Sequence, residues 1–331
     1  MQSLIDVHCH VTPNGFPPSP NAEAAGRWPC MQCTSNVAAT LLVGDKPFRE
    51  LDNRSWDVAR RLDDMDRDGV TVQVLSPMPE LLSYWLDTTH AEIICMHSNV
   101  QIAEMIAAAP KRFKGLGAVP LQDPVAAAAL LPRLRDDFGL SGVEIGSNIN
   151  GVLLGDSRFD IFWETAEDLG LAVFVHALHP VAVKSIEASP LFTAFAGFPI
   201  DVAMAAASLI TSGTLTRYPR LRIGFSHGGG ALGAILGRLD KGWSAGNRYG
   251  IADMRKPSEQ ARQLFYDSNV YDPAYLHFLA TQIAPGQVFI GTDYPYQIMQ
   301  EAPAVFATEA GLGEAALQSL YSAAATAFLN C

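Results

Sequence analysis

The chain of 331 residues is poor in positive charge: 23 lysines and arginines face 34 acidic residues, and the formal net charge is −11. No basic run is longer than a pair, so we expect no nucleic-acid partner, since binding phosphates needs clustered lysines and arginines. The most apolar stretch, 191–209, is interrupted by Pro199 and Asp201, and we expect no membrane partner. The negative net charge does not exclude an anionic small molecule as substrate, because a metal and a few arginines can make one pocket positive.

Cysteine is scarce, and the five residues are Cys9, Cys30, Cys33, Cys95 and Cys331. An odd count favours a reducing cytoplasm over a disulfide framework. The first predicted strand begins by about residue 4, which leaves no room for a signal peptide, so we expect a cytoplasmic protein. Cys30 and Cys33 have the spacing of half a zinc ribbon, but no second C-x-x-C motif exists, and we interpret them as a loop pair.

Short apolar runs, many of them rich in β-branched residues, alternate with longer segments of helical period. Strands are predicted at 4–8, 71–76, 113–119, 142–146, 171–176, 221–226, 264–269 and 287–291. Helices are predicted at 54–68, 90–109, 124–137, 157–169, 201–216, 230–245, 273–283 and 313–328. Most of the strands are continuously apolar, as strands covered on both faces should be. Eight such units without a composition break predict one domain over 1–331, a TIM-type (β/α)8 barrel, with a doubly wound sheet as the alternative.

Two segments exceed what a minimal barrel needs. Residues 11–50 form a long insertion after the first strand, rich in proline, glycine and asparagine, and 177–200 form another after the fifth. Long loops of a compact domain are usually lids or binding loops. We therefore expect both segments to be active-site loop insertions.

Polar side chains that can bind a metal follow several of the predicted strands. His8 and His10 are two residues apart at the end of the first strand, so they project to the same side. His176 closes the fifth strand, His227 follows the sixth and Asp293 follows the eighth. In a TIM-type barrel the carboxyl ends of all strands meet at one mouth, so these groups predict a metal site there. Hydrogen-bonded histidines at strand ends are the simpler alternative.

A catalytic zinc needs only three or four protein ligands and keeps a position open for water or substrate. Three imidazoles and one carboxylate would satisfy it. The remaining histidine, His227, would then be free to handle protons, because its pKa lies near neutrality.

The sequence motifs at these positions resemble those of a known family. H-x-H near the N-terminus, the histidine of strand five, S-H-G-G-G and T-D-Y-P resemble the metal-dependent amidohydrolase superfamily, and within it the α-amino-β-carboxymuconate-ε-semialdehyde decarboxylase group. Further matching stretches are Phe48-Arg49, Ser55-Trp56-Asp57, Leu62-Asp63-Asp64-Met65-Asp66, Gly69-Val70-Thr71-Val72-Gln73, Ser83-Tyr84-Trp85, Val119-Pro120-Leu121-Gln122 and Gly237-Arg238.

The resemblance implies a ligand set for one divalent ion per chain, zinc with manganese as the alternative. The implied ligands are His8, His10, His176 and Asp293. It also implies that His227 orients or deprotonates the water on that metal. Arg49 and Arg238 resemble the pair that holds substrate carboxylates, with Arg238 reaching into the neighbouring subunit, which implies a homodimer.

The resulting hypothesis is a zinc-dependent, non-oxidative decarboxylase of a small unsaturated or aromatic carboxylic acid, with His227 and Asp293 handling protons. Hydrolysis or hydration of a lactone, amide or ene-acid is the alternative reaction. A third hypothesis is a binding or structural protein whose barrel no longer catalyses a reaction. The muconate-type enzymes have Pro-Trp-Asp where this chain has Ala177-Leu178-His179, and Phe where it has Tyr296. The reaction type should therefore transfer more readily than the substrate.

The roles of three further side chains depend on where the fold places them. His179 is a substrate contact, a partner of another site residue or a loop residue, and Tyr296 is expected to contact the substrate. Glu144 lies in strand four, where binuclear members of the superfamily carry a bridging group. An inward Glu144 would make a second metal conceivable, but one ion is expected.

Overall fold

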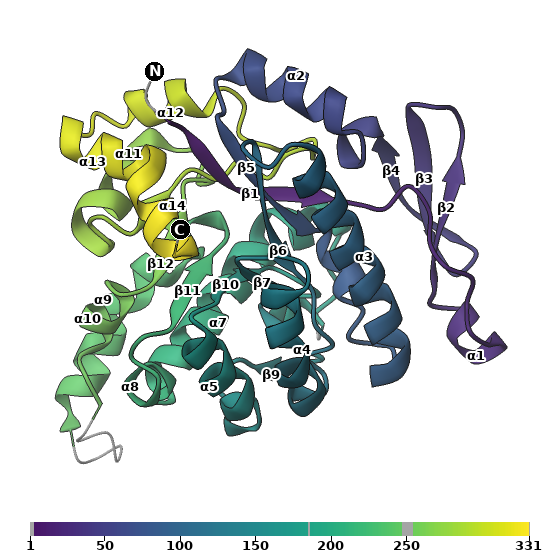
Figure 1. Ribbon diagram of the computed structural model, residues 1–331. Coiled ribbons are helices and arrows are strands. Elements are labelled where there is room, and N and C mark those ends of the chain that lie inside the picture. The colour runs from purple at the N-terminus through teal and green to yellow at the C-terminus, as the bar shows by residue number, and fades with distance from the viewer. Residues whose placement is uncertain (1–2, 185, 247–253, 331) are drawn as a thin grey trace.

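The computed structural model describes residues 3–184, 186–246 and 254–330, and its centre is a parallel sheet of eight strands (Figure 1). In spatial order these are β1 (Ile5–Val11), β5 (Val72–Pro77), β6 (Phe113–Gly117), β7 (Gly142–Gly146), β10 (Ala172–His176), β11 (Arg222–Phe225), β12 (Phe265–Asp267) and β13 (Val288–Phe289). Parallel bridges from Asp6 to Ile290 and from Cys9 to Tyr294 bring the last strand back to the first. The predicted TIM-type barrel is confirmed, every predicted strand overlaps an observed one, and the doubly wound alternative is wrong.

The strands read as apolar runs because they are covered on both faces. Every residue of β1, β7 and β10 is buried. Inside the barrel, Phe174, Phe265 and Phe289 pack against one another and against Phe328 from the last helix. Each fully buried phenylalanine stabilises the fold by roughly 1.5–3 kcal/mol. The centroid of the His8 ring lies 5.2 Å from that of Phe174, so the histidines at the strand end pack on this cluster of phenylalanines.

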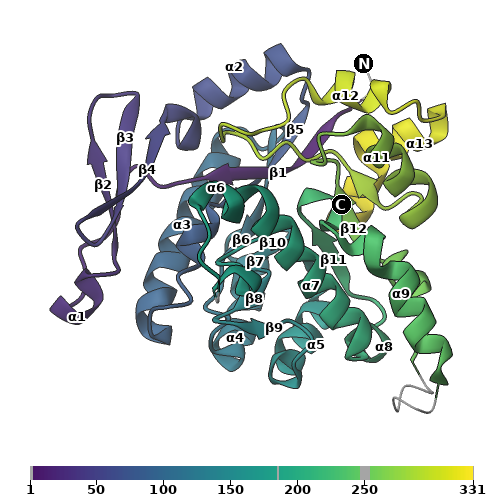
Figure 2. The ribbon, with the colours of Figure 1, turned by 180° about the vertical axis from the view of Figure 1, so that it is seen from behind.

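Helices surround the barrel on the outside (Figure 2). The main ones are α2 (Val58–Asp68), α3 (Thr88–Ala108), α4 (Pro124–Asp136), α5 (Asp160–Leu169), α7 (Phe198–Thr211), α9 (Leu232–Ser244), α11 (Pro273–Phe278) and α14 (Ala324–Leu329). Shorter helices are α8 (Thr214–Arg217), α10 (Pro257–Ala261), α12 (Pro303–Glu309) and α13 (Glu314–Gln318). Asp57 caps α2, since its carboxylate accepts from the N–H of Arg60, and Gly69 ends that helix with φ of 71°.

The first insertion is not a plain loop. It contains α1 (Ala22–Ala25) and an antiparallel sheet of β2 (Pro29–Cys33), β3 (Ala38–Val43) and β4 (Lys46–Asp52), which stands beside α3 in both ribbon views (Figures 1 and 2). Trp28, Leu41 and Leu51 are buried in a cluster with residues of α3, among them Ile94. This packing explains why a segment rich in turn-forming residues has a fixed shape.

The second insertion is largely helical. It contains η4 (Val181–Val183), α6 (Pro190–Phe192) and η5 (Thr193–Gly197), which lead directly into α7. The buried carboxylate of Asp201 accepts from Val181 N at 2.7 Å and from Asn148 Nδ2 at 2.9 Å, and it anchors the start of the insertion. Among the described residues, 190–211 form one helical stretch that is long and apolar enough to cross a membrane. A single helix of this kind is weak evidence for a span, because a core helix of a globular protein has the same length and composition, and 44% of this apolar window is buried inside the protein.

Candidate active site

Four side chains from distant parts of the chain meet at the mouth of the barrel. His8 and His10 come from β1, His176 from the end of β10, and Asp293 from the turn after β13. One nitrogen or carboxylate oxygen of each lies within 4.8 Å of those of the other three, and all four residues are buried. The structure therefore brings together the group that the strand-end pattern indicates.

Each of the three imidazoles uses Nδ1 for an acceptor outside the cluster. The pairs are His8 with Asp267 Oδ2 at 2.6 Å, His10 with the carbonyl of Pro77 at 3.1 Å, and His176 with the carbonyl of Ala177 at 2.9 Å. A carbonyl can only accept, so Nδ1 carries the ring proton in at least the latter two rings. The Nε2 lone pairs are then free to face the centre of the cluster, the arrangement found in metal-binding histidines.

Two of the four ligand atoms at the centre contact each other, since Nε2 of His8 lies 3.0 Å from Nε2 of His10, and the other two have no hydrogen-bond partner. Nε2 of His176 is buried without a hydrogen-bond partner. Oδ1 of Asp293 lies 3.2 Å from Nε2 of His8 and 3.1 Å from Nε2 of His10, yet its geometry allows no hydrogen bond to either ring. Buried lone pairs that face one another are costly without a cation between them. The donor set of three imidazoles and a carboxylate fits a divalent ion.

Electrostatics keep Asp293 and His176 in the protonation states that a cation needs. Burial alone would raise the pKa of Asp293, but His8 and His10 outweigh it and hold that pKa well below its usual range. Burial, followed by the nearby rings of His10 and His8, lowers the pKa of His176 well below its usual value. A carboxylate and neutral imidazoles are the protonation states that metal binding requires. At His8, burial alone would lower the pKa, but the carboxylates of Asp293 and Asp267 outweigh it and raise that pKa well above its usual value, so a cation that binds there displaces a proton.

His227 lies beside the cluster but not in it. It follows β11, and its ring centroid is 5.3 Å from that of His176 and 5.7 Å from that of His8. Burial lowers its pKa. Its backbone is left-handed, with φ of 54°, a conformation that residues other than glycine seldom adopt. This placement agrees with a histidine that handles protons next to a metal.

Arg49 reaches the mouth from the inserted sheet. Its guanidinium lies 4.5 Å above the ring of Tyr296, and that ring stacks on His10 with centroids 5.1 Å apart. Arg49 forms no ion pair with any residue that the structure describes, whereas the hydroxyl of Tyr296 is buried without a partner. A free cation and an unused hydroxyl thus lie together next to a predicted metal ligand.

His179 lies in the altered loop after β10. Its Nε2 is 3.2 Å from a carboxylate oxygen of Glu80, in η2 (Pro79–Leu82), and its ring lies 4.9 Å from that of Trp85. The side chain is 49% exposed. His179 therefore has a partner of its own, and the role of Glu80 was not anticipated from sequence because the two lie 99 residues apart.

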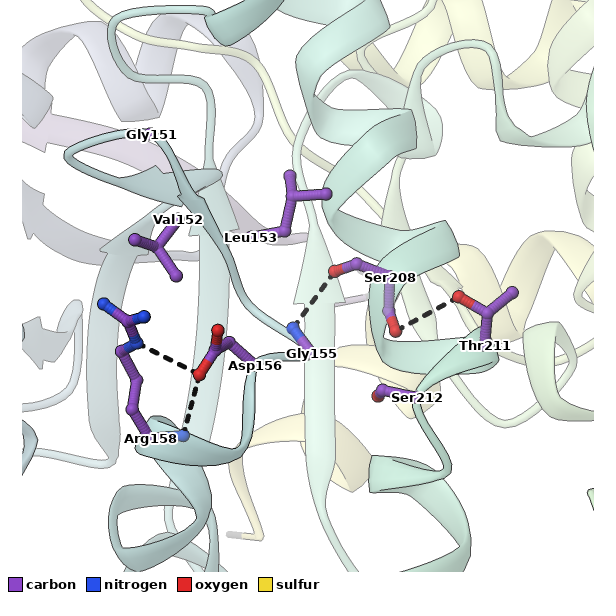
Figure 3. Close-up of a pocket in the computed structure, with 9 residues that line it drawn as sticks. All are labelled: Gly151, Val152, Leu153, Gly155, Asp156, Arg158, Ser208, Thr211 and Ser212. Atoms are coloured by element: carbon purple, nitrogen blue, oxygen red, sulfur yellow. Dashed lines mark hydrogen bonds and ion pairs between the residues drawn. The ribbon is translucent and has the colours of Figure 1, made fainter.

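Arg238 does not reach the cluster within one chain. It is exposed on α9, where it borders a surface groove with Ile235 and Trp243. A second groove runs between the segment after β9 (Val152–Leu153) and the end of α7 (Figure 3). Neither groove contains any of the four clustered residues, so neither belongs to the site at the strand ends.

Glu144 turns inward but stays outside the four-residue set. Its Oε2 lies 3.7 Å from Nδ1 of His10, and neither oxygen has a hydrogen-bond partner. Burial raises the pKa of Glu144 to about 8, so the carboxyl holds its proton at neutral pH. The four side chains whose ligand atoms cluster do not include Glu144, which favours one ion over two.

Two further residues that hold the site were missed by the sequence analysis. Asp267 supports His8, and its signal is a carboxylate at the end of a predicted strand. Arg61 is fully buried under β1, although its position on a charged helix gave no sign of burial. The four cysteines that the structure describes are all free, and Cys331 lies outside the described residues.

Comparison with known proteins shows a consistent set of relatives. The family model described as amidohydrolase matches residues 5–330. The 2-amino-3-carboxymuconate-6-semialdehyde decarboxylase of Dictyostelium discoideum is 33% identical over 303 residues, covering 90% of this chain and 83% of the relative. The crystal structure of 5-carboxyvanillate decarboxylase from Sphingomonas paucimobilis aligns with a TM-score of 0.79 and 28% identity, over 100% of this chain and 99% of that one.

A second solved relative was crystallised with ligands. It is the 5-carboxyvanillate decarboxylase of Novosphingobium aromaticivorans, complexed with manganese and 4-hydroxy-3-methoxy-5-nitrobenzoic acid. It aligns with a TM-score of 0.74 and 25% identity, over 84% of this chain and 82% of that one.

Proposed function

The chain belongs to the amidohydrolase family, and from that premise we propose that it is a metal-dependent, non-oxidative decarboxylase of a small unsaturated or aromatic carboxylic acid. The observation that carries the proposal is the convergence of four buried ligand atoms, two of them without a hydrogen-bond partner, with the free guanidinium of Arg49 at their entrance. The cluster can bind a cation, and Arg49 can bind the carboxylate of a substrate.

One divalent ion per chain is held by His8, His10, His176 and Asp293 in this proposal. Imidazole-rich ligation favours zinc. Manganese is the alternative, because the Novosphingobium relative was crystallised with it. When bound, the ion would draw negative charge from the substrate and so stabilise the charge that develops as carbon dioxide leaves.

The other residues bind the acid and move the proton. The planar guanidinium of Arg49 grips a carboxylate through two hydrogen bonds. Breaking the bond to the carboxyl carbon leaves its electron pair on the remaining carbon, and a proton must be delivered there. His227, whose ring lies 5.3 Å from that of His176, holds that proton, with Asp293 as the second group able to exchange it. Tyr296 and His179 contact the polar substituents that distinguish one acid from another.

The working unit in this proposal is a cytoplasmic homodimer of single-domain chains. Arg238 is exposed on α9 and forms no ion pair within the described part of the chain, which suits an arginine that serves a neighbour's pocket. Apolar side chains at the start of the adjoining α7 and before it are exposed as well, among them Phe195 at 58%. The four free cysteines agree with a reducing compartment.

The direct test is carbon dioxide release. Metal-free protein is reconstituted with zinc or with manganese and is given a panel of carboxymuconate semialdehydes and hydroxybenzoates. Release that requires both the metal and His176 supports the proposal, with His176→Ala as the matched negative control. Metal-loaded protein that releases no carbon dioxide, but adds water to a lactone, amide or ene-acid, would replace it with a hydrolase or hydratase. Protein that turns over none of these compounds would favour a binding role.

A further inference from the structure

The carboxylate of Asp267 contacts both the predicted metal ligand His8 and the turn that carries His227. It ends β12 and is completely buried. Its Oδ2 accepts from Nδ1 of His8 at 2.6 Å, while its Oδ1 accepts from the backbone N–H of Gly228 at 2.7 Å. Gly228 directly follows His227, so one side chain joins a predicted metal ligand to the turn that carries the proton-handling histidine.

The turn at His227 needs such an anchor. His227 and Gly228 both have left-handed backbones, with φ of 54° and 60°. For a histidine this conformation is strained and persists only where the surroundings hold it. The hydrogen bond from Gly228 N–H to Asp267 fixes the orientation of the peptide bond between His227 and Gly228.

The contact between Asp267 and His8 is closely confined. A Cβ atom built at Gly291, on the neighbouring strand end, would lie 2.6 Å from Cβ of Asp267 and 2.8 Å from Cβ of His8. Only glycine leaves room for both side chains at this point. The backbone N–H of Asn269 also donates to Oδ1 of Asp267, at 3.1 Å, and prevents the carboxylate from rotating.

We propose that Asp267 is a positioning residue that couples metal binding to proton transfer: it sets the ring orientation and tautomer of His8 and, through the same carboxylate, holds His227 at its distance from the cluster. The coupling rests on the proposed function, because it assigns His8 to the metal and His227 to the proton. Asp267 itself touches neither the ion nor the substrate.

Two variants remove the contacts of Asp267 to different extents. Asp267→Asn keeps the shape but has one acceptor oxygen, so either His8 or the Gly228 N–H loses its partner. Asp267→Ala removes both. Asp201→Asn is the matched control, because Asp201 is an equally buried carboxylate that bonds to backbone and side-chain donors but to no imidazole. If Asp267→Ala does not fold, the isosteric Asp267→Asn carries the test.

The experiment titrates metal-free protein with Zn²⁺ against a chelating indicator and then measures kcat at saturating metal. We expect Asp267→Ala to bind Zn²⁺ about 10–100-fold more weakly, and its kcat to stay at least about tenfold below wild type when metal is saturating. Asp267→Asn should show at least one of these losses, whereas Asp201→Asn should lose thermal stability without losing metal affinity.

Two results would overturn the inference alone. One is wild-type metal affinity in both Asp267 variants, and the other is complete recovery of kcat at saturating Zn²⁺, which would leave His8 as the only residue that Asp267 serves. Failure of wild-type protein to bind Zn²⁺ or Mn²⁺ would instead overturn the proposed function. The two failures are therefore distinguishable.

Discussion

The buried guanidinium of Arg61 donates a hydrogen bond of 2.8 Å from Nη1 to the backbone carbonyl of His10. The same nitrogen donates to the carbonyl of Arg54 at 2.8 Å, and the guanidinium lies 4.6 Å from the ring of Tyr294, the residue after Asp293. Arg61 therefore supports two strand ends that contribute predicted metal ligands, although it lies on a helix outside the barrel.

Removing that support should cost stability. In Arg61→Leu, the buried carbonyls of His10 and Arg54 lose their shared donor, and we expect unfolding of the metal-free protein to become easier by about 2–4 kcal/mol. Urea unfolding measures this loss. Arg60→Leu, on the exposed side of the same helix, is the control and should change stability by less than about 1 kcal/mol. Equal effects of the two variants would contradict the role given to Arg61.

The barrel was predictable because its strands depend on a pattern that tertiary context cannot easily hide. Strands covered on both faces are apolar along most of their length, and runs of this kind, for example 142–146 and 171–176, were found at their places in the sequence. The convergence of His8 with Asp293 then follows from the fold, because parallel strands in a barrel end at one mouth.

Other parts of the site were not predictable, for identifiable reasons. The strands of the inserted sheet are short and partly exposed, and Pro29 and the turn residues around them are typical of loops. The pairing of Asp267 with His8 joins residues 259 positions apart, and no local pattern records it. Arg61 shows the same limit, because a charged side chain on an amphipathic helix normally faces solvent.

The unpartnered hydroxyl of Tyr296 leads to a prediction about specificity. Because this hydroxyl is buried without a hydrogen bond, Tyr296→Phe should leave stability unchanged or raise it by up to about 1 kcal/mol. Turnover of acids with a polar ring substituent should fall, while turnover of acids without one should persist. Comparing kcat/KM for such a pair of substrates is the measurement. An equal loss for both substrates would show that the hydroxyl serves the protein and not the ligand.

Arg49 should act mainly in binding. Its guanidinium is held over Tyr296 and has no carboxylate partner among the described residues. We expect Arg49→Ala to raise KM about 10–100-fold, as loss of a charge-assisted pair of hydrogen bonds does. Lys46→Ala, an exposed change on the same strand, is the matched control. An unchanged KM in Arg49→Ala would assign the substrate carboxylate to another group.

Glu144 should make stability depend on pH. Burial raises the pKa of its carboxyl to about 8 in the folded protein, whereas an unfolded glutamate titrates near about 4.3. Its contribution is therefore fully present below about pH 4.3 and is lost as pH rises toward 8, because over that range the unfolded chain gives up this proton while the folded protein keeps it. We expect Glu144→Gln to be more stable than wild type at pH 8 and nearly equal to it at pH 4–5.

Urea unfolding of metal-free protein at pH 5 and pH 8 measures this difference. Glu104→Gln, on an exposed face of α3, serves as the control. A stability difference between Glu144→Gln and wild type that is the same at both pH values would contradict the assignment of a proton to Glu144.

The central claim, one divalent ion held by four named side chains, is tested most directly by anomalous diffraction from crystals soaked with Mn²⁺ or Zn²⁺. We expect one peak per chain, bonded to Nε2 of His8, His10 and His176 and to a carboxylate oxygen of Asp293, and no peak in His176→Ala. An empty cluster after soaking, or an ion bound elsewhere while these four groups stay free, would contradict it.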